Sequence, residues 1–238
     1  MSGRGRVLLV VGGASGIGRA LAGSARAEGW RVVVMDVSPA SADDEPEEWI
    51  QVDSRNLRAV EDASQVIADR WGGLDAVVIT AGVTDPATIA TITAERVQDI
   101  VNVNVTSAIT LLTRVVPLVK EGSSIVLVSS VAALRGGGYF GASTYAASKA
   151  ALEGLARGLA RELAPRSIRV NCIAPGPTAT PMLLAAPANV IERVEGATLL
   201  GRLGRPDEIA AVAMFLIDDT ASFMTGAVVA VDGGASIK

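Results

Sequence analysis

The chain has 238 residues and a formal net charge of −4, and half of its residues are hydrophobic. This length suits one α/β domain, so we predict a single unit over residues 1–238. The acidic balance excludes the basic footprint that nucleic acid requires. The sequence contains no histidine, which excludes histidine-based metal sites and histidine general bases, and we predict no metal site.

Apolar runs alternate with helical patterns from one end of the sequence to the other. The predicted strands are Val7–Val11, Val32–Met35, Trp49–Val52, Leu74–Thr80, Ser124–Ser129, Ile168–Ile173 and Ala227–Val231. The predicted helices are Ile17–Glu28, Leu57–Trp71, about Glu95–Leu118, Thr144–Leu163 and Pro206–Ile217, with Ser41–Glu48 as an acidic loop or short helix. Such alternation requires parallel strands joined by right-handed crossovers. It predicts a doubly wound, Rossmann-like sheet of seven strands with helices on both faces.

The N-terminus resembles a signal peptide because Arg4 and Arg6 precede the apolar run Val7–Val11. That run is short and continues directly into Gly12-Gly13, so a first buried strand explains it better. No apolar stretch approaches the roughly 18 residues of a membrane span, and we expect no membrane contact. The single cysteine, Cys172, excludes a disulfide within the chain and favours a small buried residue in a cytoplasmic protein.

Glycines follow the first predicted strand and open the first helix, with the spacing Gly12-x-x-x-Gly16-x-Gly18. Without a Cβ, the backbone can approach a pyrophosphate closely, and a helix N-terminus offers free N–H groups to it. The same residues would also suit a simple tight turn. Their position after the first strand favours phosphate binding.

Asp36 ends the second strand, where a carboxylate can accept hydrogen bonds from both ribose hydroxyls of NAD. It would repel the extra phosphate of NADP. Neither Val37 nor Ser15 supplies a positive charge to that phosphate, so NAD is the predicted cofactor. Asp53 follows the third strand and can accept from the adenine amino group, although a turn or a helix cap would also explain it.

Tyr145 and Lys149 are four residues apart at the start of a helix, so both side chains point to one side. An ammonium near a phenol lowers the phenol pKa, which gives a general acid/base without histidine. The chain contains 18 arginines and only three lysines, so a lysine here is a distinct choice. An amphipathic helix with a packed tyrosine and an exposed lysine is the alternative interpretation.

Two further polar residues lie where the same site would need them. Ser130 follows the fifth strand and can hold the substrate oxygen beside Tyr145, with Ser129 as its neighbour. Asn104 lies in the middle of a predicted helix, where asparagine is unfavourable, so we predict a polar role in holding a water that links Lys149 to solvent.

Taken together, these motifs resemble the short-chain dehydrogenase/reductase family across nearly the whole chain. The matching pieces are Gly12-x-x-x-Gly16-x-Gly18, Asp36, Asp53, Ala81-Gly82, Asn104, Ser130, Tyr145-x-x-x-Lys149, Pro175-Gly176 and Gly204-Arg205-Pro206. The resemblance implies a catalytic tetrad of Asn104, Ser130, Tyr145 and Lys149. It also implies a nicotinamide pocket at Ile173–Gly176 with carboxamide contacts from Thr178 and Thr180. The ending from Thr225-Gly226 to Gly233-Gly234 implies a homotetramer.

The predicted site therefore has two sets of residues. The dinucleotide-binding residues are Gly12, Ser15, Gly16, Ile17, Gly18, Asp36, Val37, Asp53, Ser54, Ala81, Gly82, Tyr145, Lys149, Pro175, Gly176, Thr178 and Thr180. The substrate-binding residues are Ser130, Tyr139, Tyr145 and Met182, and residues 176–204 form a predicted substrate loop. Val83, Leu134, Phe140, Leu183 and Leu184 are further apolar candidates. Arg135 can meet an anionic substrate, although a surface position also explains it.

Three features depart from the family pattern. Val11 stands where the family usually has Thr, which removes a hydrogen bond, and Ile79-Thr80 stand where it has Asn-Asn. The interval from Ser130 to Tyr145 is slightly longer than usual, which predicts a distinctive substrate wall.

The predicted activity is NAD-dependent interconversion of a secondary alcohol and a ketone, with Tyr145 as general acid/base. The alternatives are a 3-oxoacyl thioester reductase, which would usually use NADPH, and a dinucleotide-sensing protein without turnover.

Overall fold

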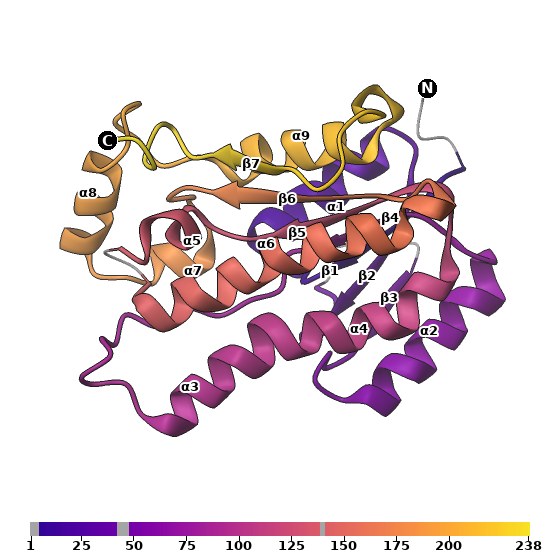
Figure 1. Ribbon diagram of the computed structural model, residues 1–238, viewed down its shortest axis with the longest axis horizontal. Coiled ribbons are helices and arrows are strands. Elements are labelled where there is room, and N and C mark those ends of the chain that lie inside the picture. Colours follow the sequence, from indigo (N-terminus) through magenta and orange to yellow (C-terminus); the bar gives the residue numbers. More distant parts are fainter. Residues whose placement is uncertain (1–4, 42–47, 139–140) are drawn as a thin grey trace.

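Seven parallel strands form the centre of the molecule, in the order β3-β2-β1-β4-β5-β6-β7 (Figure 1). The computed structural model describes residues 5–41, 48–138 and 141–238. The strands are β1 Val7–Val11, β2 Arg31–Asp36, β3 Glu48–Gln51, β4 Leu74–Ile79, β5 Val119–Val128, β6 Arg169–Pro175 and β7 Val228–Val231. The predicted doubly wound sheet is confirmed. β5 begins five residues earlier than expected, and its register with β4 shifts between Leu74 and Ala76.

The central strands of the sheet are buried on both faces over most of their length, as parallel sheets require, whereas the edge strands β3 and β7 are only partly covered. Every residue of β1 is at most 4% exposed, which confirms the interpretation of Val7–Val11 as a first strand. Cys172 in β6 is fully buried, as expected. Burial raises the pKa of its thiol to about 12, so the thiol is held protonated and unreactive.

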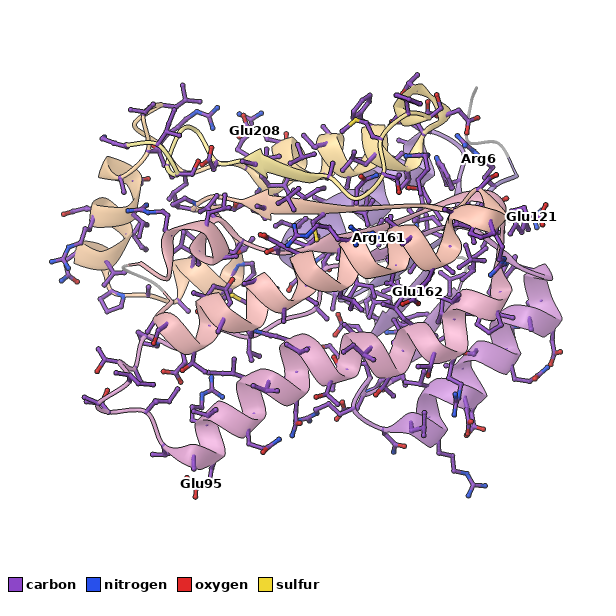
Figure 2. The ribbon with its side chains drawn as sticks, in the orientation of Figure 1. Arg6, Glu95, Glu121, Arg161, Glu162 and Glu208 are labelled. Atoms are coloured by element: carbon purple, nitrogen blue, oxygen red, sulfur yellow. The ribbon has the colours of Figure 1, made fainter. Side chains whose placement is uncertain are left out.

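Helices cover both faces of the sheet. They are α1 Gly16–Ala27, α2 Leu57–Trp71, α3 Ala94–Val101, α4 Ser107–Val115, α5 Val131–Arg135, α6 Ser143–Leu163, α7 Pro181–Leu184, α8 Ala188–Gly196 and α9 Pro206–Ile217. One apolar core lies beneath α2, α4 and α6, and a second lies beneath α1 and α9. The outer faces are polar, and Glu95 on α3 and Glu162 on α6 point outward there (Figure 2).

The segment Ala94–Leu118 runs as one rod through α3, a π-helical turn at Asn102–Thr106, α4 and a 3-10 turn at Val116–Leu118 (Figure 1). By length and composition this segment could cross a membrane, which corrects our expectation that no stretch comes close. The face formed by Ile100, Ala108, Leu111 and Val115 is buried inside the protein. This one-sided burial is typical of a core helix.

Residues 176–204 contain two helices, Pro181–Leu184 (α7) and Ala188–Gly196 (α8), which the sequence did not predict, and the rest of this segment is loop. Both ends of the segment are joined: Gly204 pairs with Thr178, and its carbonyl accepts from Ala179 N at 2.9 Å. The segment is therefore a closed lobe, and its helices lie beside α5 at the carboxyl end of the sheet (Figure 1). Helix α5, which begins directly after Ser130, was also missed from the sequence.

Candidate active site

A cleft of about 620 Å³ opens at the carboxyl ends of the strands. It passes the point where β1 and β4 are neighbours and the strand order reverses, which is where doubly wound sheets bind ligands. Every predicted dinucleotide-binding residue lines this cleft, and so do Ser130 and Met182. Asn104 lies just behind the wall. Tyr139 and Phe140 fall outside the described residues, so their predicted substrate contacts stay predictions.

The glycine loop lies so close to the end of β4 that no side chain would fit at Gly12. Gly12 has a φ of +87°, and a Cβ there would lie 2.6 Å from the backbone nitrogen of Ala81. The hydroxyl of Thr80 lies 2.9 Å from the carbonyl oxygens of both Val11 and Gly12 and donates to them. Thr80 thus supplies a side-chain hydrogen bond to the end of β1, where the sequence had predicted a loss at Val11. A cradle without side chains remains, and it suits a pyrophosphate.

Asp36 joins the glycine loop to the end of β2. Its carboxylate accepts from the backbone nitrogens of Ala14 and Ser38, each at 2.9 Å. These bonds fix the carboxylate at the wall of the cleft and leave lone pairs that can accept from ribose hydroxyls. Val37 beside it is 62% exposed and carries no charge.

Asp53 forms a forked ion pair with Arg55, with a shortest nitrogen–oxygen distance of 2.7 Å. The hydrogen bonds from Arg55 lower the pKa of Asp53, so the carboxylate stays ionised. Sequence reasoning missed this pair, because it took Asp53 as a free acceptor for the adenine amino group. Arg55 also faces Asp99 at 3.6 Å. The end of the cleft where we predict the adenosine is therefore lined by three carboxylates, those of Asp36, Asp53 and Asp99, and by one guanidinium that is already paired.

Tyr145 and Lys149 lie on one face of α6, and the Lys149 nitrogen is 6.0 Å from the centre of the Tyr145 ring. Lys149 is 4% exposed and donates to the carbonyl of Val128 at 3.0 Å. Burial lowers the pKa of Lys149 to about 8. The interpretation of this residue as a solvated surface lysine is therefore wrong.

The expected lowering of the Tyr145 pKa by Lys149 is not what the structure shows. Burial raises the pKa of Tyr145, and only a hydrogen bond with Ser130 opposes that increase. Desolvation penalises the phenolate more than its surroundings stabilise it. The phenol is therefore held protonated and hydrogen-bonded to Ser130.

Ser130 and Ser129 have different partners. Ser130 is the N-cap of α5, and its side-chain oxygen accepts from Ala132 N at 3.1 Å. Ser129 is buried, and its hydroxyl lies 3.0 Å from the carbonyl of Lys149 and from the carboxylate of Glu153. Ser129 thus ties β5 to α6, and Ser130 is the hydroxyl beside Tyr145, as the sequence predicted.

Asn104 is 1% exposed and lies within the π-helical turn. Its side chain bonds to both the nitrogen and the carbonyl of Val83, at 2.8 and 2.9 Å, and to Ser148 at 2.9 Å. A Cβ on Gly82 would lie 3.2 Å from the Asn104 oxygen and 2.9 Å from the Lys149 nitrogen, so both groups converge on Gly82. The irregular turn explains how an asparagine is tolerated in mid-helix.

The Tyr145 ring is held from behind by Gly141. A Cβ on Gly141 would lie 2.3 Å from the ring and 3.0 Å from the Thr84 hydroxyl. Ala142 N donates to the carbonyl of Asp85 at 3.0 Å, and the Asp85 carboxylate pairs with Arg96 of α3. The loop after β4 therefore fixes the segment that carries Tyr145.

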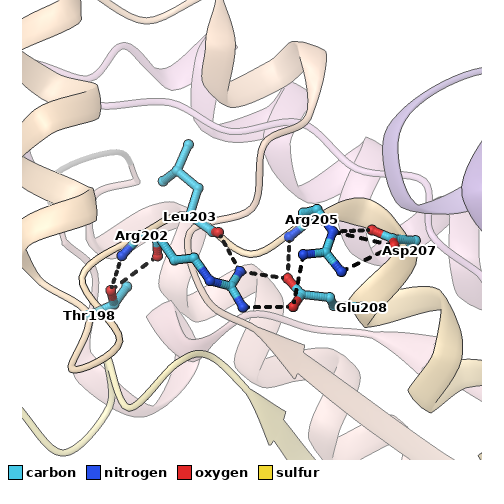
Figure 3. Close-up of polar contacts among 6 residues, drawn as sticks. All are labelled: Thr198, Arg202, Leu203, Arg205, Asp207 and Glu208. Atoms are coloured by element: carbon cyan, nitrogen blue, oxygen red, sulfur yellow. Dashed lines mark hydrogen bonds and ion pairs between the residues drawn. The ribbon is translucent and has the colours of Figure 1, made fainter.

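The end of the cleft beside Tyr145, where we predict the substrate, is mainly apolar. Val83, Met182 and Leu183 line it. Leu134 and Leu184 are exposed and do not line the cleft, so their prediction as pocket residues is wrong. The lobe that carries Met182 is anchored at its far end by Glu208 of α9, which binds Arg202 at 2.8 Å and Arg205 N at 2.7 Å (Figure 3). These bonds, led by those of Arg202, lower the pKa of Glu208 to about 2.

Comparison with known proteins agrees with this geometry. A family model described as enoyl-(acyl carrier protein) reductase matches residues 12–236. The 3-oxoacyl-(acyl-carrier-protein) reductase FabG of Thermotoga maritima is 36% identical over 98% of both chains. The cis-4-hydroxycyclohexanecarboxylate dehydrogenase of Sinomonas cyclohexanicum is 32% identical over 96% of both. A solved short-chain dehydrogenase/reductase from Serratia marcescens is 31% identical, with a TM-score of 0.90 over 99% of this chain and all of that one.

A Rossmann-like sheet with a glycine cradle and a Tyr–Lys pair defines an oxidoreductase that uses a nicotinamide dinucleotide. The chain belongs to the short-chain dehydrogenase/reductase family.

Proposed function

We propose that this enzyme interconverts a secondary alcohol and a ketone with NAD(H). The glycine loop and Asp36 would hold the dinucleotide in the cleft, and its nicotinamide would supply the hydride acceptor or donor for the carbinol carbon. Ser130 holds the substrate oxygen by a hydrogen bond, and Tyr145 delivers or removes the proton on that oxygen. Lys149 binds ribose hydroxyls and adds positive charge beside the phenol.

The convergence of Ser130, Tyr145 and Lys149 on the same cleft as the glycine loop carries this proposal. The cleft fits a dinucleotide because Gly12 and Gly82 leave the space that their missing side chains would fill. Because burial raises the pKa of Tyr145, the phenol is ready to donate in the reductive direction. In the oxidative direction, the positive charges of Lys149 and of oxidised nicotinamide stabilise the phenolate.

The adenosine end of the cleft favours NAD over NADP. Asp36 presents a carboxylate at the ribose position, with Asp53 and Asp99 further along the wall. Arg55 is the one cation among the described residues that line this end, and it is paired with Asp53. A 2′-phosphate would meet net negative charge there.

A second candidate is a 3-oxoacyl thioester reductase, which the relative from Thermotoga maritima favours. The same residues would serve that reaction, because it also reduces a ketone to a secondary alcohol. The preference for NAD at Asp36 counts against it, since such a reductase would usually use NADPH. A dinucleotide sensor without turnover would not need the complete set of Asn104, Ser130, Tyr145 and Lys149.

The test is NADH formation with a panel of secondary alcohols that includes ring alcohols, and NADH oxidation with the matching ketones and a 3-oxoacyl thioester. Tyr145→Phe should reduce turnover by roughly two to four decades, the span of acid–base contributions, with NAD binding retained. Near-normal turnover in Tyr145→Phe would refute the role of Tyr145. Absence of turnover across the panel would favour the sensor.

We also propose a cytoplasmic homotetramer. Support comes from the family-like ending of the chain and from β7, an edge strand of the sheet whose residues are only partly covered. Phe223, which precedes β7, is fully exposed. Light scattering measures the native mass, and a mass near that of one 24.3 kDa chain would rule the assembly out.

A further inference from the structure

Charge is distributed unevenly along the cleft. Asp36, Asp53, Arg55 and Asp99 belong to the adenosine end. Among the described residues that line the catalytic end, the charged groups are Lys149 and Arg135. Lys149 is buried and bonded to Val128, so it cannot turn toward the substrate wall.

Arg135 is exposed at the cleft and has no ion pair or hydrogen bond from its side chain to any described residue. Its surroundings on this wall are Val131, Ala132, Gly137 and Gly138, which offer it no carboxylate. The other cleft arginine, Arg55, is fully paired with Asp53. The guanidinium of Arg135 is therefore available to a ligand.

The position of Arg135 is tied to that of the reacting oxygen. Helix α5 begins after its N-cap, Ser130, and ends at Arg135, so the two α-carbons are separated by roughly 7–8 Å along the axis. The helix is closed by Gly136, whose backbone nitrogen donates to the Ala132 carbonyl in a left-handed conformation with a φ of +75°. Because Ser130 and Arg135 also line the same cleft, one small molecule in that cleft could contact both of them.

We propose that Arg135 is a specificity-determining residue that binds a carboxylate of the substrate. The substrate is then a hydroxy acid or keto acid whose carboxylate is a few bonds away from the reacting carbon. This inference rests on the proposed alcohol–ketone chemistry and adds the charge of the substrate to it. The guanidinium fork matches the two carboxylate oxygens, and the apolar wall strengthens the pairing.

The test compares 4-oxocyclohexanecarboxylate with its methyl ester, because the ring fixes the separation of the two groups and only the charge differs. Wild type should have the higher kcat/KM on the acid. Arg135→Gln should lower kcat/KM on the acid by about tenfold to a hundredfold and leave the ester unchanged. Arg135→Lys should retain part of the preference, because it keeps the charge and loses the fork.

Arg161→Gln is the matched control. Arg161 is an exposed arginine on α6, 16 residues beyond Tyr145 and so about 24 Å along the helix, and it lies outside the cleft (Figure 2). The Arg161→Gln substitution removes one positive charge, as Arg135→Gln does, and should leave kcat/KM unchanged on both the acid and the ester. If kcat/KM on the acid fell equally in the two variants, general electrostatic attraction would explain the preference, and the proposal would be overturned.

A binding measurement separates this inference from the proposed function. Cyclohexanecarboxylate has no carbinol group to oxidise, and its affinity for the enzyme with NAD⁺ is measured by calorimetry. Weaker binding to Arg135→Gln supports the carboxylate site even if no ketone is turned over. Equal binding to both proteins overturns it. Turnover of the ester and the acid at equal rates would overturn the inference as well, and would leave the alcohol–ketone chemistry standing.

Discussion

The charge of Lys149 lowers the stability of the folded protein, although the proposed reaction needs it. It is almost completely buried, and burial lowers its pKa from 10.5 to about 8. At pH 7 the amine is still charged, so the folded protein bears a desolvation cost that the unfolded chain does not. The proposed reaction needs that charge beside Tyr145. Stability is therefore sacrificed at the residue that supports the chemistry.

Lys149→Met should accordingly raise the free energy of unfolding at pH 7 while abolishing turnover. The shift corresponds to a cost on the order of 3 kcal/mol, less about 1 kcal/mol for the lost bond to the Val128 carbonyl. Between pH 8 and about 10.5 the folded wild type loses this proton and the unfolded chain keeps it, so wild-type stability rises with pH. The advantage of the variant should therefore shrink over that window.

Urea unfolding of both proteins at a series of pH values from 7 to 10.5 measures this difference. Lys120→Met is the control, because Lys120 is half-exposed and paired with Asp75 at 2.9 Å. It should bring no stabilisation at pH 7. A Lys149→Met protein that is less stable than wild type at pH 7 would contradict the idea that the buried charge is costly.

At the scale of elements, the glycine loop depends on its neighbour β4. Thr80 follows β4 and donates to the carbonyls of Val11 and Gly12, so one hydroxyl joins the end of β1, the loop and the next strand. Thr80→Val keeps the shape and removes this bond. We expect the KM for NAD⁺ to rise several-fold with kcat little changed, and the stability to fall by about 1 kcal/mol.

Thr113→Val provides the comparison for that experiment. The Thr113 hydroxyl also donates to a backbone carbonyl, that of Thr110 at 2.7 Å, but on the exposed face of α4. Loss of the Thr113 hydroxyl should leave the KM for NAD⁺ unchanged. If Thr80→Val binds NAD⁺ with wild-type affinity in a fluorescence titration, the loop does not depend on this hydroxyl.

Long elements with clear ends could be predicted from the sequence. Helix α2 has the predicted bounds, because Asn56 caps its start by accepting from Ala59 N and Gly72 closes its end with a φ of +67°. The helices α5 and α7 have five and four residues, too few to show a helical period. The π-helical turn Asn102–Thr106 lies inside the predicted helix Glu95–Leu118, and a single turn is too short to change the helical pattern.

The site residues could be predicted as a set but not in their ionisation or pairing. Each lies at a strand end or a helix start, and the topology brings such positions to one edge. The pairing of Asp53 with Arg55 depends on the loop geometry after β3, which no periodicity encodes. The raised pKa of Tyr145 depends on burial by neighbours that no local pattern encodes, namely Gly141 just before the helix and the loop after β4 far away in the sequence.

At the scale of the whole molecule, the cleft is built from both halves of the sheet. The β1–β2 side supplies the glycine loop and Asp36, and the β4–β5–β6 side supplies Ser130 and the wall at Pro175-Gly176. A dinucleotide in the cleft would contact both halves and would have no such surface in the unfolded chain. Cofactor binding should therefore raise the free energy of unfolding of the whole domain.

NAD⁺ at about a hundred times its Kd should raise the stability by about 2.7 kcal/mol, or the Tm by roughly 5–10 °C for a chain of this size. NADP⁺ at the same concentration should raise the Tm much less, because its 2′-phosphate would meet the carboxylates of Asp36, Asp53 and Asp99. Asp36→Ala should reduce the difference between the Tm increases that NAD⁺ and NADP⁺ produce. Asp69→Ala is the control, because it removes an exposed carboxylate on α2 that is bonded to Gln65, and it should leave that difference unchanged. Thermal unfolding with each cofactor decides the question, and an equal Tm increase with NADP⁺ in wild type would show that Asp36 does not select against the phosphate.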